Sequence, residues 1–118
     1  MMKKADPIST EIIRNAFISI AQDMNAVLIR SAYTPVIYEG KDCVVALLDE
    51  KGEVLGQSSG LPLFLGNLQV CVQETAKMYG WDYFKEGDIF FVNDSFFTGT
   101  HPNKKSDATN MENIFIDI

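Results

Sequence analysis

The residues best suited to chemistry lie in one short stretch, Asn93-Asp94-Ser95-Phe96-Phe97-Thr98-Gly99-Thr100-His101, which holds the only histidine of the chain. The stretch follows an apolar run, Ile89–Val92, that indicates a buried strand. Asp107 comes shortly after the histidine. Carboxylate and imidazole groups are the ligand mix of a divalent-metal site such as Mn or Zn. The pattern therefore predicts polar ligands in a loop that a rigid strand positions.

On the residues alone, plainer interpretations stay open. His101 also suits an ordinary loop histidine that hydrogen-bonds backbone, and Asn93-Asp94 is a common way to end a strand in a turn. Gly99 likewise suits a simple turn.

Two helices and a small sheet are expected to position this loop. Either Asp6, with Pro7 at the first helical position, or Ser9 can cap a long first helix that ends near Ser31, before Pro35. The following residues recur at three- to five-residue steps and indicate one apolar stripe of an amphipathic helix: Ile8, Ile12, Phe17, Ile20, Met24, Val27 and Leu28.

A β-hairpin follows, with strands at 43–48 and 53–57 joined by Asp49-Glu50-Lys51-Gly52. Asn67 is a plausible cap for a second helix that ends at Gly80. After the strand at 89–92, residues 114–118 resemble the start of another strand. The order predicts an α+β fold: a single domain over residues 1–118, in which both helices pack on a small, mainly antiparallel sheet containing the hairpin.

Composition excludes several classes of function. The chain has 118 residues, enough for one domain with a modest core, and a net charge of −6. Nucleic acid or an anionic membrane surface would call for a basic face. No apolar run approaches the ~20 residues that span a bilayer. The residues after Lys3-Lys4 lack the apolar region of a signal peptide, so the cytoplasm is the expected location.

No other catalytic or nucleotide site is visible in the sequence. Cys43 and Cys71 sit in apolar segments without a C-x-x-C pair, which favours two reduced thiols over a zinc site. The Ser58-Ser59-Gly60 segment lacks the glycine pattern of a nucleophile elbow. Phosphate-binding loops are absent, so no cofactor-binding or catalytic residue is assigned.

Several ordered segments together resemble the N-terminal part of hydantoinase B/oxoprolinase proteins. They cover nearly all of residues 5–101, and residues 102–118 form a divergent tail. The segments are Asp6-Pro7-Ile8, Ile13-Arg14-Asn15-Ala16, Arg30-Ser31-Ala32-Tyr33-Thr34-Pro35, Leu48-Asp49-Glu50-Lys51-Gly52, Leu61-Pro62-Leu63-Phe64-Leu65-Gly66 and Gly87-Asp88, followed by the stretch that ends at His101.

The resemblance implies a B-type subunit of an ATP-dependent amidohydrolase that opens hydantoin, 5-oxoproline or other lactam rings. Related acetone and acetophenone carboxylases use the same subunit type. ATP would be handled by a companion A-type subunit, and the B-type subunit supplies a metal-centred site in some members. His101 is then the expected metal ligand and Asp107 the second, while Asn93, Asp94, Gly99 and Thr100 shape the loop or contact substrate.

This chain departs from the family pattern near the expected site. The family places Asp three positions after its histidine, where Lys104 stands here. Asp107 replaces it only through a looped 103–106 segment, because six extended residues cover ~20 Å. Family proteins are also several times longer.

These departures lead to two hypotheses. One is a truncated or split subunit that is inactive without an A-type subunit or the rest of the B-type subunit. The other is a non-catalytic oligomerisation or interaction domain that keeps the family's N-terminal fold and pairs as a homo-oligomer.

Overall fold

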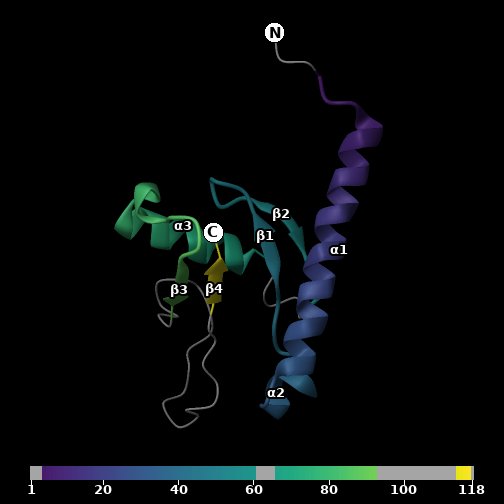
Figure 1. Cartoon of the computed structure of the whole chain (residues 1–118), viewed down its shortest axis with the longest axis vertical. Coiled ribbons are helices and arrows are strands. Elements are labelled where there is room, and N and C mark those ends of the chain that lie inside the picture. Colours follow the sequence, from purple (N-terminus) through teal and green to yellow (C-terminus); the bar gives the residue numbers. More distant parts are fainter. Residues whose placement is uncertain (1–3, 61–65, 93–113, 118) are drawn as a thin grey trace. The chain divides into compact units, whose positions relative to one another are not determined.

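The computed structural model describes residues 4–60, 66–92 and 114–117, and it confirms an α+β fold (Figure 1). Contacts divide the chain into two compact units, Met1–Leu61 and Pro62–Ile118. The first unit contains α1 (Pro7–Ser31), α2 (Pro35–Tyr38), β1 (Ala46–Leu48) and β2 (Val54–Gln57). The second contains α3 (Asn67–Tyr79), the 3₁₀ turn η2 (Trp81–Tyr83), β3 (Ile89–Val92) and β4 (Ile114–Asp117). The single-domain organisation expected from the sequence stays a prediction.

Helix α1 begins at the first of the two caps considered. The Asp6 carboxylate accepts hydrogen bonds from the Ser9 backbone N–H at 3.2 Å and from the Ser9 hydroxyl at 3.0 Å. These bonds lower the pKa of Asp6. Pro7 occupies the first turn, where a missing N–H costs nothing. The helix ends at Ser31, as predicted, and Ala32 is extended.

The buried face of α1 differs from the predicted apolar stripe. Of that stripe, only Phe17 and Leu28 are half-buried, and the other members are exposed. The buried or half-buried residues of the helix are Phe17, Ile18, Ala21, Asn25, Leu28 and Ile29. The difference has a physical cause, because a hairpin with strands of three and four residues covers only part of a 25-residue helix. Figure 1 shows the first turns of α1 (purple) extending past the hairpin.

The predicted hairpin forms as an antiparallel β1–β2 pair with a bulge between Leu47 and Leu48. Its turn depends on Asp49, whose carboxylate accepts the backbone N–H groups of Lys51 at 2.8 Å and Glu53 at 2.9 Å. Gly52 adopts φ 74°, a left-handed conformation that glycine takes up without steric cost. Beyond β2, Ser58 and Val45 exchange two further hydrogen bonds that lengthen the ladder.

In the second unit, α3 buries one face of the helix. Cys71, Val72, Thr75 and Ala76 are buried, whereas Tyr79 is exposed. Asn67 is the first helical residue and not the cap predicted for it. Gly66 holds the cap position in a left-handed conformation, and as a glycine it has no side chain that could cap the helix.

Two one-turn helices, α2 and η2, lie between the longer elements, and neither was predicted from the sequence. A single turn shows no hydrophobic period, so the periodicity could not reveal them. Thr34 caps α2 through its hydroxyl, which accepts the Val36 N–H at 3.3 Å. None of the helices in the described part of the chain is long and apolar enough to cross a membrane.

Candidate functional site

Strands β3 and β4 bracket the segment that carries every predicted site residue. They pair antiparallel over their full length, from Ile89 opposite Asp117 to Val92 opposite Ile114. Directly opposed residues in such a pair have Cα atoms about 4.5–5.5 Å apart. The chain therefore leaves β3 at Val92 and returns to its immediate neighbour at Ile114, which confirms the strand expected near the end of the sequence.

Contacts between aromatic rings hold β3 in its unit. The Phe90 ring lies 4.6 Å from Phe84 and 5.8 Å from Tyr83, between ring centroids. Tyr83 stacks in turn on Tyr79 of α3 at 5.2 Å, and Trp81 lies 5.9 Å from Phe84. Tilted rings at such distances attract each other beyond their simple burial. No role was predicted for residues 81–84, although three aromatic residues in four positions were a signal for this cluster.

An open hollow of about 530 Å³ lies beside these rings. It is lined by Asp82, Tyr83, Lys85, Asp88, Ile89 and Phe90. One of its carboxylates is already engaged, because Asp88 accepts the Lys85 backbone N–H at 3.2 Å and so closes the turn into β3. The hollow thus combines an aromatic wall with charges of both signs, at the entrance to the strand that leads to the predicted loop.

The predicted site residues themselves lie outside the described residues. This holds for the proposed ligands His101 and Asp107 and for the loop residues Asn93, Asp94, Gly99 and Thr100. Within residues 4–60, 66–92 and 114–117, no group of three or more His, Cys, Asp or Glu side chains is arranged to hold a metal ion. The structure therefore describes the strands on either side of the segment that carries these residues, and the metal site itself stays a prediction.

Neither cysteine is activated as a nucleophile. Cys71 is fully buried, and this burial raises the pKa of its thiol to about 11. Cys43 is half-buried, and desolvation, followed by the charge of Asp42, raises its pKa as well. The Cys43 thiol donates to Asn25 Oδ1 of α1 at 3.5 Å. Both thiols are free and mainly protonated near neutral pH, and a protonated thiol is a weak nucleophile.

Ser58, the other nucleophile considered, has a structural role. Its side chain is buried, and Ser58 Oγ accepts the Val45 backbone N–H at 3.0 Å. The Ser58 N–H donates to the Val45 carbonyl at 2.8 Å. Both bonds tie the residue into the hairpin.

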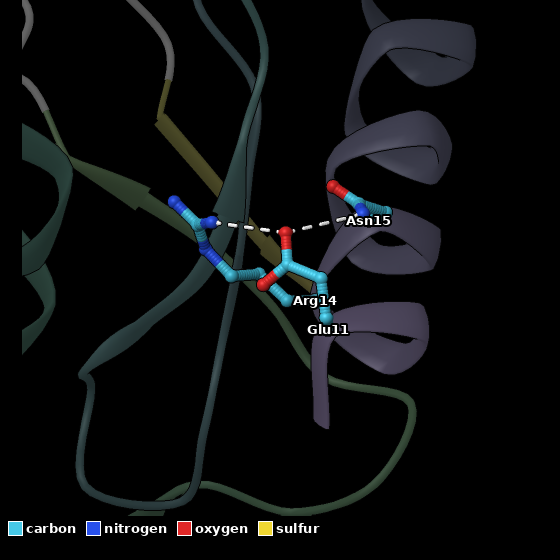
Figure 2. Close-up of polar contacts among 3 residues, drawn as sticks. All are labelled: Glu11, Arg14 and Asn15. Carbon is cyan, nitrogen blue, oxygen red and sulfur yellow. Dashed lines mark hydrogen bonds and ion pairs between the residues drawn. The ribbon is translucent and has the colours of Figure 1, made fainter. Parts of the chain in front are cut away.

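A polar network on the first turns of α1 joins residues that are only three or four positions apart. Figure 2 shows Glu11 Oε1 accepting from Arg14 at 3.5 Å and from Asn15 at 3.3 Å. All three residues are exposed. Exposed pairs of this kind contribute about 0.3–0.5 kcal/mol to helix stability. The network supports the helix and offers no catalytic constellation.

Comparison with known proteins places this architecture in a family. The sequence model of hydantoinase B/oxoprolinase matches residues 6–117. An uncharacterized protein of Methanocaldococcus jannaschii is 32% identical, with 93% of this chain and 19% of that protein covered. The 5-oxoprolinase of Saccharomyces cerevisiae is 31% identical, covering 81% of this chain and 7% of that enzyme. The caprolactamase subunit beta of Pseudomonas jessenii is 29% identical, covering 85% of this chain and 17% of that subunit.

The chain thus spans less than one fifth of the length of these relatives. No solved structure gives a significant match. The family match nevertheless extends over almost every residue, from the capped start of α1 to the end of β4. On this evidence, the chain belongs to the hydantoinase B/oxoprolinase family.

Proposed function

We propose that this chain forms part of a B-type subunit in a multi-chain enzyme that opens cyclic amides with the consumption of ATP. The observation that carries the proposal is the family match over residues 6–117. The names of two relatives, 5-oxoprolinase and caprolactamase subunit beta, both refer to the hydrolysis of a ring amide. In such a reaction one water adds across the ring C–N bond to give an amine and a carboxylate, and a second water is consumed as ATP becomes ADP and phosphate.

The proposal includes further chains. The name of the caprolactamase relative describes a subunit, and this chain covers only 17% of it. A companion A-type subunit would bind ATP, because the sequence carries no phosphate-binding loop. The rest of a B-type subunit would complete the ring-binding site. Two free, protonated cysteines suit a reducing compartment, so we place this assembly in the cytoplasm.

The proposed metal site lies in the loop bracketed by β3 and β4. His101 would bind Mn or Zn, with Asp107 as second ligand and Asn93, Asp94, Gly99 and Thr100 shaping the loop. A bound divalent ion would polarise the ring carbonyl as a Lewis acid. Two protein ligands are fewer than the three of a usual catalytic zinc site. The proposal therefore includes at least one ligand from another part of the assembly.

The test is a reconstitution with a panel of rings. The chain is combined with an A-type subunit and the remaining part of a B-type subunit, and ADP formation is followed with hydantoin, 5-oxoproline or caprolactam. The proposal expects ring-dependent ADP formation that disappears when this chain is left out. Equal rates with and without the chain contradict it.

A second candidate function is a non-catalytic interaction domain that assembles as a homo-oligomer. It is favoured by α1, where Ile8, Ile12 and Ile13 are each more than half exposed. Metal content separates the two candidates. Stoichiometric Mn or Zn in the reconstituted assembly supports the enzyme-derived site, and an assembly that stays metal-free, with this chain a stable oligomer by itself, supports the interaction domain.

A further inference from the structure

One face of α1 carries apolar side chains at the spacing of a helix–helix interface. Ile13, Phe17, Ile20, Met24 and Val27 follow one another at steps of four, three, four and three residues. We name these five residues the α1 seam. Alternating steps of four and three define the heptad repeat by which one helix packs against another. The spacing therefore fits an α-helix as the partner of this face.

The α1 seam is open along most of its length. Ile13, Ile20, Met24 and Val27 are 54%, 47%, 45% and 57% exposed. Only Phe17 is half-buried, beside the hairpin. At 100° per residue the seam lies within an arc of about 80°, opposite the exposed Gln22. Its rise from Ile13 to Val27 is about 21 Å, or four turns of helix.

The first unit has little core of its own to stabilise so long a helix. Among the described residues 4–60, Ala21 is the only buried apolar side chain. Stable helices in proteins depend mainly on burial of an amphipathic face. A contiguous apolar face that remains exposed marks an interaction surface. The α1 seam thus has the features of an interaction surface.

We propose that the α1 seam docks against an amphipathic helix from the part of a B-type subunit that this chain does not contain. The relatives that match this chain devote more than four fifths of their length to other regions. A second copy fits less well. The four exposed side chains of the α1 seam supply only part of the area of a standard interface, which buries about 800 Å² on each partner. A larger subunit can contact further surfaces of this chain at the same time.

The inference rests on the family membership and concerns binding alone. Its failure would leave the proposed ring-opening activity standing, and loss of that activity would leave the docking intact. The experiment therefore measures association and does not use turnover.

The double variant Ile13→Glu/Ile20→Glu places two carboxylates in the seam and keeps good helix-forming residues. The matched control, Ser19→Glu/Gln22→Glu, adds the same residue type at two exposed positions outside the seam. Each form is co-expressed with the remaining four fifths of the M. jannaschii relative. The segment of the M. jannaschii relative that matches this chain, about one fifth of that protein, serves as the positive control. Light scattering and thermal unfolding of the chain by itself complete the set.

The inference expects a one-to-one complex with the wild-type chain and the control, and at least tenfold lower recovery with the seam variant. The chain by itself should be monomeric, and its Tm should differ by less than about 4 °C between the seam variant and the control.

Three results would overturn the inference. The first is an equal yield of complex with the seam variant and with the control variant. A complex that forms with the matched fifth of the M. jannaschii relative, but not with this chain, counts as the same result. The second is a dimer of the chain that the seam variant dissociates, which assigns the seam to a second copy. The third is a Tm of the chain by itself that falls much further in the seam variant than in the control, which shows that the seam is already covered within the chain.

Discussion

Gly56 of β2 lies directly on the backbone of α1 at Phe17. A methyl group at Gly56 would stand 2.6 Å from the Phe17 carbonyl carbon, 2.8 Å from the Phe17 oxygen and 2.8 Å from the Ile18 nitrogen. Cβ atoms essentially never come within 3.0 Å of such atoms. The absence of a side chain at this position therefore sets how closely the hairpin approaches the helix.

We expect Gly56→Ala to lower the free energy of unfolding by about 1–3 kcal/mol, the usual cost of overpacking a tight contact. The obstructing atoms belong to the backbone, so the neighbouring side chain cannot relieve them by changing rotamer. Urea denaturation followed by circular dichroism measures the effect.

Gly60→Ala is the control, because its nearest contact is a longer 3.2 Å to the Cys43 carbonyl oxygen. The double variant Gly56→Ala/Phe17→Ala adds a second check. If removal of the Phe17 side chain restores stability, the contact with the helix backbone is not the cause.

The turn between β1 and β2 should give the protein an acid-sensitive element. Hydrogen bonds from the backbone N–H groups of Glu53 and Lys51 lower the pKa of Asp49 in the folded protein. Its stabilising effect is then complete above the unfolded pKa of about 3.9 and is lost as pH falls through the lower folded value. The stability difference between wild type and Asp49→Asn should shrink as pH drops below about 4.

Denaturation curves from pH 7 to pH 2.5 test this dependence. Glu50→Gln, in the same turn, provides the control for general charge effects, since no hydrogen bond to the turn backbone is seen for Glu50 among the described residues. A difference between wild type and Asp49→Asn that stays constant across this range would argue against the carboxylate as the turn's anchor.

Cys71 should link stability to alkaline pH in the opposite direction. Burial raises its pKa to about 11 in the folded protein, above the unfolded value of about 8.5. The contribution of the protonated Cys71 thiol to the free energy of unfolding is therefore complete below about pH 8.5 and declines as pH rises toward 11. Cys71→Ala should show a weaker loss of stability than wild type between pH 8.5 and 10.5. Equal losses of stability in wild type and Cys71→Ala would mean that folding does not raise the pKa of the Cys71 thiol.

His101 is the residue on which the proposed metal site depends. We expect elemental analysis of the assembly reconstituted with Mn or Zn to show bound metal that His101→Ala in this chain abolishes and Asp107→Asn reduces. Lys104→Ala is the control, because an ammonium group does not bind a metal. Unchanged metal content in His101→Ala would remove this histidine from the site.

Local signals made much of the fold predictable. Asp6-Pro7 marked the start of α1, and Asp49 through Gly52 marked the hairpin turn, because each motif satisfies its own backbone groups. The buried face of α1 was not predictable in the same way. It depends on where Gly56 meets Phe17, a contact between residues far apart in sequence.

The sequence predicted the strands on either side of the proposed site, but not how these strands pair. The apolar run at Ile89–Val92 revealed the strand, and Ile114–Asp117 revealed its partner. Their register, with Val92 opposite Ile114, arises from pairing across the intervening segment. No local sequence signal indicates such a register. The roles of His101 and Asp107 depend on the resemblance and stay predictions.

The central claim is that this chain works as part of a cyclic-amide hydrolase assembled from several chains. Its most direct test is the rate of ring-dependent ADP formation by an A-type subunit and the remaining B-type part, with and without this chain. The rate should rise in proportion to added chain until the complex is saturated. A rate that is independent of the chain, for every ring in the panel, would contradict it.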